Sequence, residues 1–170
     1  MFSTSFTVNA LPMVLFASKY DRVAFDSMEE GDSLSMRQKL VRHGLSNVGS
    51  RLHLLNAEPV AELKERLARR KSYNIIVIDS FQYTQMSYRD YILFKERNKD
   101  KLIIFISHAK GNAPRGSAAE GVMYDATLKI WVEGFKAFSK GRFIGQTGEF
   151  TIWDEGAARY WGEISKTTEV

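Results

Sequence analysis

The hydrophobic pattern of the chain is marked by continuous apolar runs that end on polar residues. The clearest run occupies residues 74–80, where the β-branched residues Ile75 to Ile78 are followed by Asp79 and Ser80. A continuous apolar run indicates a strand buried on both faces, as at the centre of a parallel sheet. Residues 101–107 form a second such run. The pattern therefore predicts a parallel sheet in which Asp79 closes a central strand.

The segments around these runs predict helices and strands in alternation, followed by strands alone. The expected helices occupy residues 10–20, 34–43, 59–71, 86–97 and 157–163. The expected strands occupy residues 22–28, 51–57, 74–79, 101–107, 128–133, 135–142 and 149–153, and residues 110–121 are expected to form a polar loop. This order predicts one α/β domain over residues 1–170, with a mostly parallel sheet flanked by helices and antiparallel hairpins at the C-terminal end.

The composition is that of an ordinary globular protein, with 44% hydrophobic and 26% charged residues. No apolar run approaches the 18 or so residues of a membrane span, and the N-terminus lacks the pattern of a secretory signal. The chain has no cysteine, which excludes disulfides, thiolate metal sites and cysteine nucleophiles. We therefore expect a cytoplasmic protein without a membrane segment. The net charge of +4 favours a polyanionic partner, although a merely basic surface explains it equally well.

Two carboxylates follow successive expected strands, Glu29 after residues 22–28 and Asp79 at the end of residues 74–79. In an open parallel sheet both lie at the edge where ligands bind. One acid on a magnesium ion and another polarising a water is what phosphoryl hydrolysis needs. His108 follows the next strand and could sense a γ-phosphate. The alternatives are that Glu29 belongs to a solvated turn and that His108 simply begins a loop.

Two groups of cations are also candidates for binding phosphates. Lys140 and Arg142 lie one residue apart on an expected strand, so they point the same way and could bind a phosphate together. The loop that carries Lys110, Asn112 and Arg115 could contact a nucleic-acid backbone. The alternatives are an edge strand guarded by charge and an ordinary surface loop. No pair of histidines has metal-ligand spacing, so we expect no zinc site.

Five short segments, in this order, resemble motifs of the RecA-like ATPase core, in particular of the RadA (Sms) repair ATPases and the DnaB-type helicases. They are residues 27–30 (SMEE), 77–82 (VIDSFQ), 106–111 (ISHAKG), 139–143 (SKGRF) and 145–153 (GQTGEFTIW). The resemblance covers roughly residues 10–161 and implies a RecA-like fold with ATP and Mg²⁺ as cofactors. It also implies DNA, single-stranded in the first place, as a partner, together with further copies of the chain or intact ATPase subunits.

The resemblance also implies roles for individual residues. Glu29 would be the catalytic glutamate, Asp79 would hold Mg²⁺ through a water, and His108 would sense the γ-phosphate. Lys140 and Arg142 would reach the nucleotide of an adjacent subunit. The residues implied in nucleotide binding are Thr7, Asp79, Ser80 and Gln82, and those implied in DNA binding are Lys110, Asn112 and Arg115.

The phosphate loop of that family, G-x-x-x-x-G-K-[ST], does not occur in the sequence. Residues 5–10 stand about where it is expected, and there Thr7 matches the hydroxyl residue while Ser5 and Phe6 replace glycine and lysine. The lysine charge and the main-chain approach that glycine permits are then lost. We expect weak ATP binding and absent or very slow hydrolysis. Two explanations remain open. The chain is a truncated or decayed copy of an active ATPase, or one whose start is mis-assigned. Alternatively, it is a genuine non-hydrolysing partner subunit or DNA-binding module. A third alternative is an unrelated α/β protein.

Overall fold

The computed structural model describes residues 6–142 and 148–162, with side chains from residue 11 onward. The chain divides into two compact units, Met1–Val122 and Met123–Val170. Each unit has its own sheet, and the two are described separately below. Within the described residues, no helix combines the length and the hydropathy that crossing a bilayer requires.

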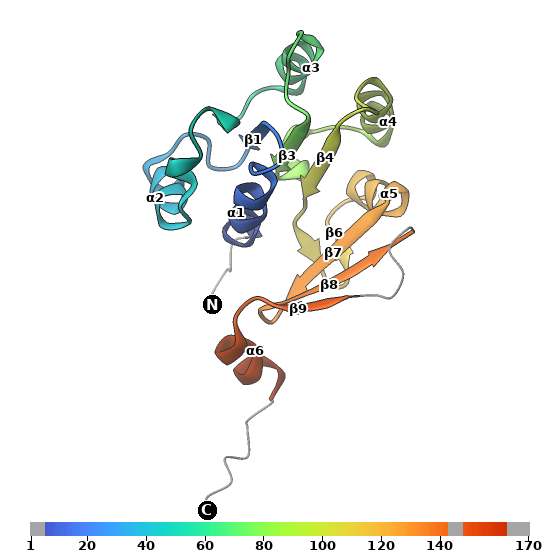
Figure 1. Cartoon of the computed structure of the whole chain (residues 1–170). Coiled ribbons are helices and arrows are strands. Elements are labelled where there is room, and N and C mark those ends of the chain that lie inside the picture. The colour runs from blue at the N-terminus through green and yellow to red at the C-terminus, as the bar shows by residue number, and fades with distance from the viewer. Residues whose placement is uncertain (1–5, 143–147, 163–170) are drawn as a thin grey trace, which may run out of the picture. The chain divides into compact units, whose positions relative to one another are not determined.

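The first unit is built on a parallel sheet of four strands in the order β2-β1-β3-β4 (Figure 1). The strands are β1 (Val23–Ser27), β2 (Leu52–Leu55), β3 (Ile75–Asp79) and β4 (Leu102–Ile106). All three strand pairings are parallel. The predicted α/β class and the parallel sheet are therefore confirmed, with β1 and β3 at its centre.

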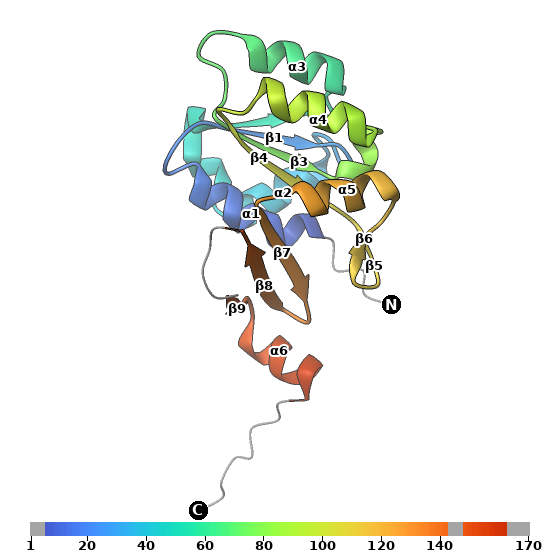
Figure 2. The same cartoon turned by 90° about the vertical axis from the view of Figure 1, so that its right-hand side faces the viewer.

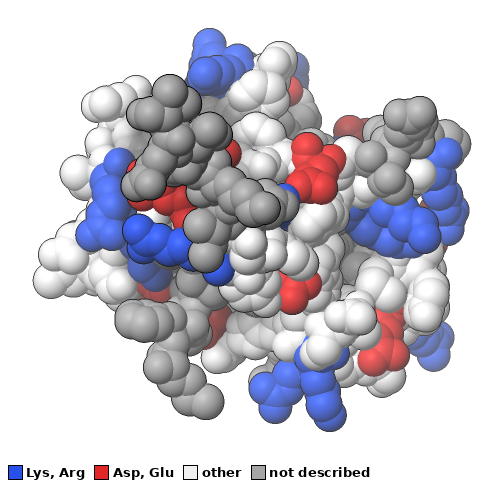
Figure 3. Space-filling view, turned by 90° about the horizontal axis from the view of Figure 1, so that it is seen from below, with Lys and Arg blue, Asp and Glu red and all other residues white. Residues whose placement is uncertain are grey.

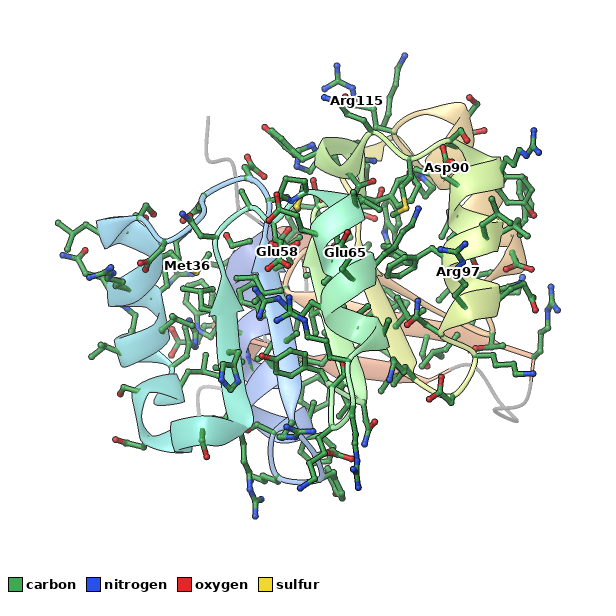
Figure 4. The ribbon with its side chains drawn as sticks, turned by 90° about the horizontal axis from the view of Figure 1, so that it is seen from above. Met36, Glu58, Glu65, Asp90, Arg97 and Arg115 are labelled. Atoms are coloured by element: carbon green, nitrogen blue, oxygen red, sulfur yellow. The ribbon has the colours of Figure 1, made fainter. Side chains whose placement is uncertain are left out.

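Helices cover both faces of this sheet (Figure 2). They are α1 (Phe6–Ala17), α2 (Leu34–Arg42), α3 (Val60–Ala68), α4 (Tyr88–Arg97) and α5 (Ser117–Asp125), with short 3-10 turns at Leu45–Arg51 and Phe81–Thr84. One core joins Ile76 and Ile78 to α3, α4 and α5. The other joins Ile75 and Val77 to α1 and α2, where Met36 points inward (Figure 4). Burial on both faces explains why β3 is continuously apolar.

Two features of the first unit differ from the sequence prediction. The first helix begins at Phe6 rather than near residue 10, so Pro12 lies in its interior and Thr7 lies in its first turn. The segment expected as a polar loop contains a hairpin, β5 (Ala109–Lys110) with β6 (Ala113–Pro114), and the start of α5. Packing accounts for the helix, because Ala119 and Val122 are buried in the core with α3 and α4.

The strand β4 is less buried than its continuous apolar sequence predicts. Leu102 is 54% exposed, and the other four residues of the strand are only partly buried. The cause is position, since β4 is an edge strand that pairs with β3 alone among the described strands. An apolar run thus identifies a strand of a parallel sheet without showing whether it is central or at an edge.

The second unit is an antiparallel sheet in the order β7-β8-β9, followed by α6 (Asp154–Trp161). Its strands are β7 (Leu128–Glu133), β8 (Lys136–Gly141) and β9 (Glu149–Thr151), which confirms the predicted hairpins. Gly134 and Phe135 connect β7 to β8 with φ angles of 53° and 62°, as a tight two-residue hairpin turn requires. Phe135 is held there by edge-to-face packing on Trp153, with ring centroids 5.0 Å apart.

One buried acid makes the stability of the fold depend on pH. Asp26 on β1 is 0% exposed, and its Oδ1 accepts a hydrogen bond from the Glu58 amide at 3.0 Å, while its Oδ2 has no hydrogen-bond partner. Burial raises the pKa of this carboxyl to about 6, and the nearby charge of Glu58 adds to the rise against the opposing effects of that hydrogen bond and Arg66. The neutral acid is therefore the form that suits the folded state.

We expect Asp26→Asn to stabilise the protein at pH 7 but not at pH 4. The folded state binds the proton more tightly than the unfolded chain, so this carboxyl lowers stability progressively as pH rises from about 4 through about 6. The penalty that the amide removes at pH 7 is at most about 3 kcal/mol. Urea unfolding at several pH values measures it, with Asp21→Asn as the matched control.

Relative to the wild type, the control Asp21→Asn should be less stable at pH 7 than at pH 4. The reason is that hydrogen bonds from the Asn74 side chain and the Arg22 amide lower the pKa of Asp21 and so favour its charged form. An Asp26→Asn variant whose stability relative to the wild type is the same at pH 4 and pH 7 contradicts the account.

Candidate functional site

The carboxyl ends of three parallel strands bring the candidate acids and histidine together. Ser27, Asp79 and Ile106 occupy one row of the sheet, because Ser27 pairs with Asp79 and Asp79 with Ile106. The segments that follow these residues leave the sheet side by side. Glu29 and His108 lie 79 residues apart in sequence and meet there.

Glu29 contacts His108 directly. The carboxylate Oε2 lies 3.2 Å from the imidazole Nε2, and the two side chains are 39% and 32% exposed. The hydroxyl of Ser80 lies 3.4 Å from the same nitrogen. The ring of Tyr83 packs edge-to-face against the imidazole, with centroids 6.0 Å apart. Glu29 lies exposed in a turn and, together with Ser80 and His108, forms a small polar cluster.

Asp79 supports this cluster from within the sheet. Its carbonyl oxygen accepts the amides of Met28 at 2.7 Å and Glu29 at 3.3 Å, which fixes the start of the segment that bears Glu29. Its side chain is buried, with the residue 2% exposed, and belongs to the face of the sheet that α1 and α2 cover. Ser27 lies in register beside Asp79 on that face and is 1% exposed.

Gln82 links the end of β4 to the β5–β6 hairpin. Its Oε1 accepts the His108 amide at 3.1 Å, and its Nε2 donates to the Ser107 hydroxyl at 2.7 Å and to the Arg115 carbonyl at 2.9 Å. The Arg115 amide in turn donates to the His108 carbonyl at 2.7 Å. Both amide hydrogens of Gln82 are therefore used within the protein, and the side chain sets the positions of His108 and Arg115.

The three residues expected to contact DNA lie on or beside this hairpin. Lys110 ends β5, Asn112 lies in the turn next to Gly111, and Arg115 follows β6. All three are exposed, and Figure 4 shows Arg115 at the rim, away from the sheet. The hairpin thus presents two cations and one amide to solvent on a main chain that Gln82 and His108 hold.

Lys140 and Arg142 belong to the second unit, and they have different neighbours. Lys140 is exposed on β8, directly opposite Lys129 on β7. Arg142 lies one residue beyond β8, where its guanidinium donates to the Tyr124 carbonyl at 3.2 Å and its amide to the Thr127 carbonyl at 3.0 Å. The sequence predicts that these two cations point the same way. It does not predict that the guanidinium of Arg142 donates to a carbonyl at the end of α5.

A pocket of about 250 Å³ adjoins Gln82 and the start of α5. Its walls come from the 3-10 turn Phe81–Thr84, from Gln85 and Met86, and from residues 115–119. Pockets for drug-sized ligands usually span about 300–1,000 Å³, so this hollow is small for a nucleotide. Thr7 lies in the first turn of α1, and its side chain is outside the described part of the structure.

The described residues at this edge do not form a complete site for a resident magnesium ion. In nucleotide sites Mg²⁺ is held by one or two carboxylates and completes its shell with waters and phosphate oxygens. The candidate ligands are the Asp79 carboxylate and the Ser27 hydroxyl beside it, and both residues are buried, with exposures of 2% and 1%. Among the described residues, no three His, Asp or Glu side chains gather as metal ligands.

The structure adds Ser27, Ser107 and Tyr83 to the residues of the candidate site. Ser27 could have been found from the expected pairing of two apolar strands, since it ends one as Asp79 ends the other. Ser107 ends an expected strand at the same edge as His108, but its contact with Gln82 is set by the fold, as is that of Tyr83 with His108.

Comparison of the sequence with protein-family models and with curated proteins gives no match. The fold and this edge therefore define the class of the protein on their own. It is an open parallel α/β protein with a polar cluster of Glu29, Ser80 and His108 above a buried aspartate.

We expect Gln82→Ala to loosen the β5–β6 hairpin without unfolding the sheet. The variant removes the hydrogen bonds to Ser107, His108 and Arg115, and the lost bonds should cost about 1 kcal/mol of local opening free energy. Amide hydrogen exchange at His108 and Arg115 should then be roughly fivefold faster.

The matched control is Gln38→Ala, since Gln38 is exposed on α2 and makes no comparable contact. Unchanged exchange at His108 and Arg115 in the Gln82 variant would show that the amide does not position the hairpin.

Proposed function

We propose that the chain is a RecA-like domain of the kind found in DNA-dependent ATPases of repair, recombination or replication. In this chain ATP binding is weak and hydrolysis is absent or very slow. The observation that carries the proposal is the contact of Glu29 with His108 across the carboxyl edge of β1, β3 and β4, beside Asp79. In open α/β sheets this edge is where ligands bind.

The residues at this edge have the chemistry that a terminal phosphate and its attacking water require. Glu29 is a partly exposed carboxylate that can orient a water. His108 and Ser80 provide hydrogen-bonding groups next to it. Asp79 and Ser27 would hold the magnesium ion, whose role when bound is to neutralise charge on the phosphates. Because Glu29 already contacts His108, an entering phosphate would have to replace that contact.

The weakness of nucleotide binding follows from what the sequence lacks. A phosphate loop supplies main-chain amides at glycine positions and a lysine charge, and the chain contains no Gly-Lys dipeptide. The N-terminus of α1, where Thr7 lies in the first turn, would offer a bound phosphate main-chain amides alone. Ser80 is buried against His108, and the amide group of Gln82 is already used by the hairpin, so either side chain would have to leave its present partner to bind a nucleotide.

The partners in this proposal are single-stranded DNA and further ATPase subunits. The hairpin with Lys110, Asn112 and Arg115 would contact the DNA backbone, and Gln82 would connect it to His108. Lys140 and Arg142 would serve a nucleotide on an adjacent copy of the chain or on an intact ATPase. Arg142 would then have to leave the Tyr124 carbonyl.

A second candidate function is a non-hydrolysing DNA-binding module on the same scaffold. The observation that favours it is the exposure of Lys110, Asn112 and Arg115 on a hairpin whose main chain is held in place. Such a module would bind single-stranded DNA without nucleotide and with an affinity that falls as salt rises.

The test is binding and turnover of a fluorescent ATP analogue by the full chain, with Mg²⁺ and single-stranded DNA present. We expect weak binding that needs Mg²⁺ and that Asp79→Asn weakens at least about tenfold, by removing a charged ligand. We expect no turnover above the background. The matched control is Asp100→Asn, because Asp100 is an exposed acid on the loop after α4.

The outcomes separate the parts of the proposal. Binding that is independent of Mg²⁺ and of Asp79 contradicts a nucleotide site at this edge. Robust hydrolysis that Asp79→Asn abolishes contradicts the expected loss of activity.

A further inference from the structure

Two lysines face each other on the second unit, and neither forms an ion pair with a described residue. Lys129 on β7 and Lys140 on β8 are direct partners in the antiparallel ladder, so their side chains leave the same face of the hairpin. Like charges directly opposite each other destabilise a sheet. Among the described residues neither lysine has a carboxylate within ion-pair distance, whereas the neighbouring Lys136 pairs with Glu149 at 2.9 Å.

An aromatic pair lies next to these lysines on the same face. Trp131 and Phe138 are also direct partners, and each lies two residues from a lysine, which is one repeat of a strand. Both rings are partly exposed. The indole nitrogen of Trp131 donates to Glu133 Oε2 at 3.0 Å, which fixes the ring. Phe138 packs edge-to-face on Trp161, with centroids 6.1 Å apart.

Cations beside an aromatic ring match the chemistry of single-stranded nucleic acid. The lysines attract the phosphates, and the ring offers a surface on which an unpaired base can stack. Duplex DNA keeps its bases stacked inside and presents mainly phosphates, so the aromatic pair favours the single strand. Figure 3 shows basic side chains in several separate groups with acidic side chains between them. The net charge of +4 therefore does not identify a binding surface, whereas lysines next to aromatic rings do.

We propose that the face of β7 and β8 with Lys129, Trp131, Phe138 and Lys140 binds single-stranded nucleic acid. The two lysines contact phosphates, and one base stacks on Trp131. This site differs from the β5–β6 hairpin and needs no nucleotide at the edge of the parallel sheet. It shares Lys140 with the proposed contact to a nucleotide of an adjacent subunit. Because binding here requires no nucleotide, it can be tested separately from the proposed ATPase-related function.

The first test measures the salt dependence of binding between the full chain and a fluorescent oligothymidylate, without ATP or Mg²⁺. Each phosphate contact in a single strand contributes about 0.7 to the slope of log affinity against log salt. The Lys129→Gln/Lys140→Gln variant should therefore lower the slope by about 1.4. The control Lys19→Gln/Lys99→Gln removes the same charge from exposed lysines elsewhere and should leave the slope unchanged.

The second test addresses stacking. Trp131→Leu keeps an apolar side chain but removes the flat ring, and we expect affinity to fall at least about fivefold. Trp131→Phe keeps a flat ring and should bind nearly as well as the wild type. If the indole acted only through its hydrogen bond to Glu133, Trp131→Phe would bind as weakly as Trp131→Leu. Thermal unfolding of each variant shows whether the second unit remains folded, and the lysine variant tests the site without altering the rings.

Three results would overturn the proposal. They are an unchanged salt slope in the double lysine variant, equal affinity of folded Trp131→Leu and wild type, and equal binding of a duplex of the same length. Because the assay contains no nucleotide, failure of the ATP-binding prediction has no bearing on it.

Discussion

The register of β1, β3 and β4 is the constraint on which the candidate site depends. Ser27, Asp79 and Ile106 share one row, so the chain segments after them leave the sheet at one place. The register is specified because both faces of β1 and β3 are buried in different cores. A slip of one residue would turn Asp79 from the face of α1 and α2 to that of α3 and α4. It would also separate Glu29 from His108.

The same register gives two aspartates different environments. Asp26 precedes Ser27 by one residue and therefore points to the opposite face, where burial favours its neutral form. Asp79 lies on the other face, and its carbonyl oxygen holds the amides of Met28 and Glu29. Main-chain contacts of this kind connect the centre of the sheet to the polar cluster. Gln82 extends the connection to the hairpin, because it is hydrogen-bonded to both His108 and Arg115. A displacement of His108 would therefore also displace Arg115.

Much of the first unit could be predicted from the sequence because its strands are short apolar runs with polar ends. The positions of Glu29, Asp79 and His108 at one edge followed from that pattern and from parallel pairing. The cap of α2 is equally local, since the Ser33 hydroxyl accepts the Met36 amide at 3.1 Å. Such features depend on neighbours in the sequence.

What the sequence did not predict depends on distant contacts. The sequence of residues 110–121 predicts a polar loop, but the burial of Ala119 and Val122 stabilises the helix α5 there. Lys129 lies opposite Lys140 only because a two-residue turn at Gly134 and Phe135 sets the hairpin register. Gln82 resembles a nucleotide contact in a local motif, yet the fold places Ser107 and Arg115 around it. The RecA-like ancestry inferred from the motifs stays a proposal.

The most direct measurement of the central claim is nuclear magnetic resonance mapping of the labelled chain. Mg²⁺ and a non-hydrolysable ATP analogue would be titrated to millimolar concentration. The account predicts that the resonances which shift belong to residues 27–29, 79–82 and 106–109, including the imidazole of His108. Shifts confined to other parts of the chain, or none at all, would contradict a nucleotide site at the carboxyl edge of the parallel sheet.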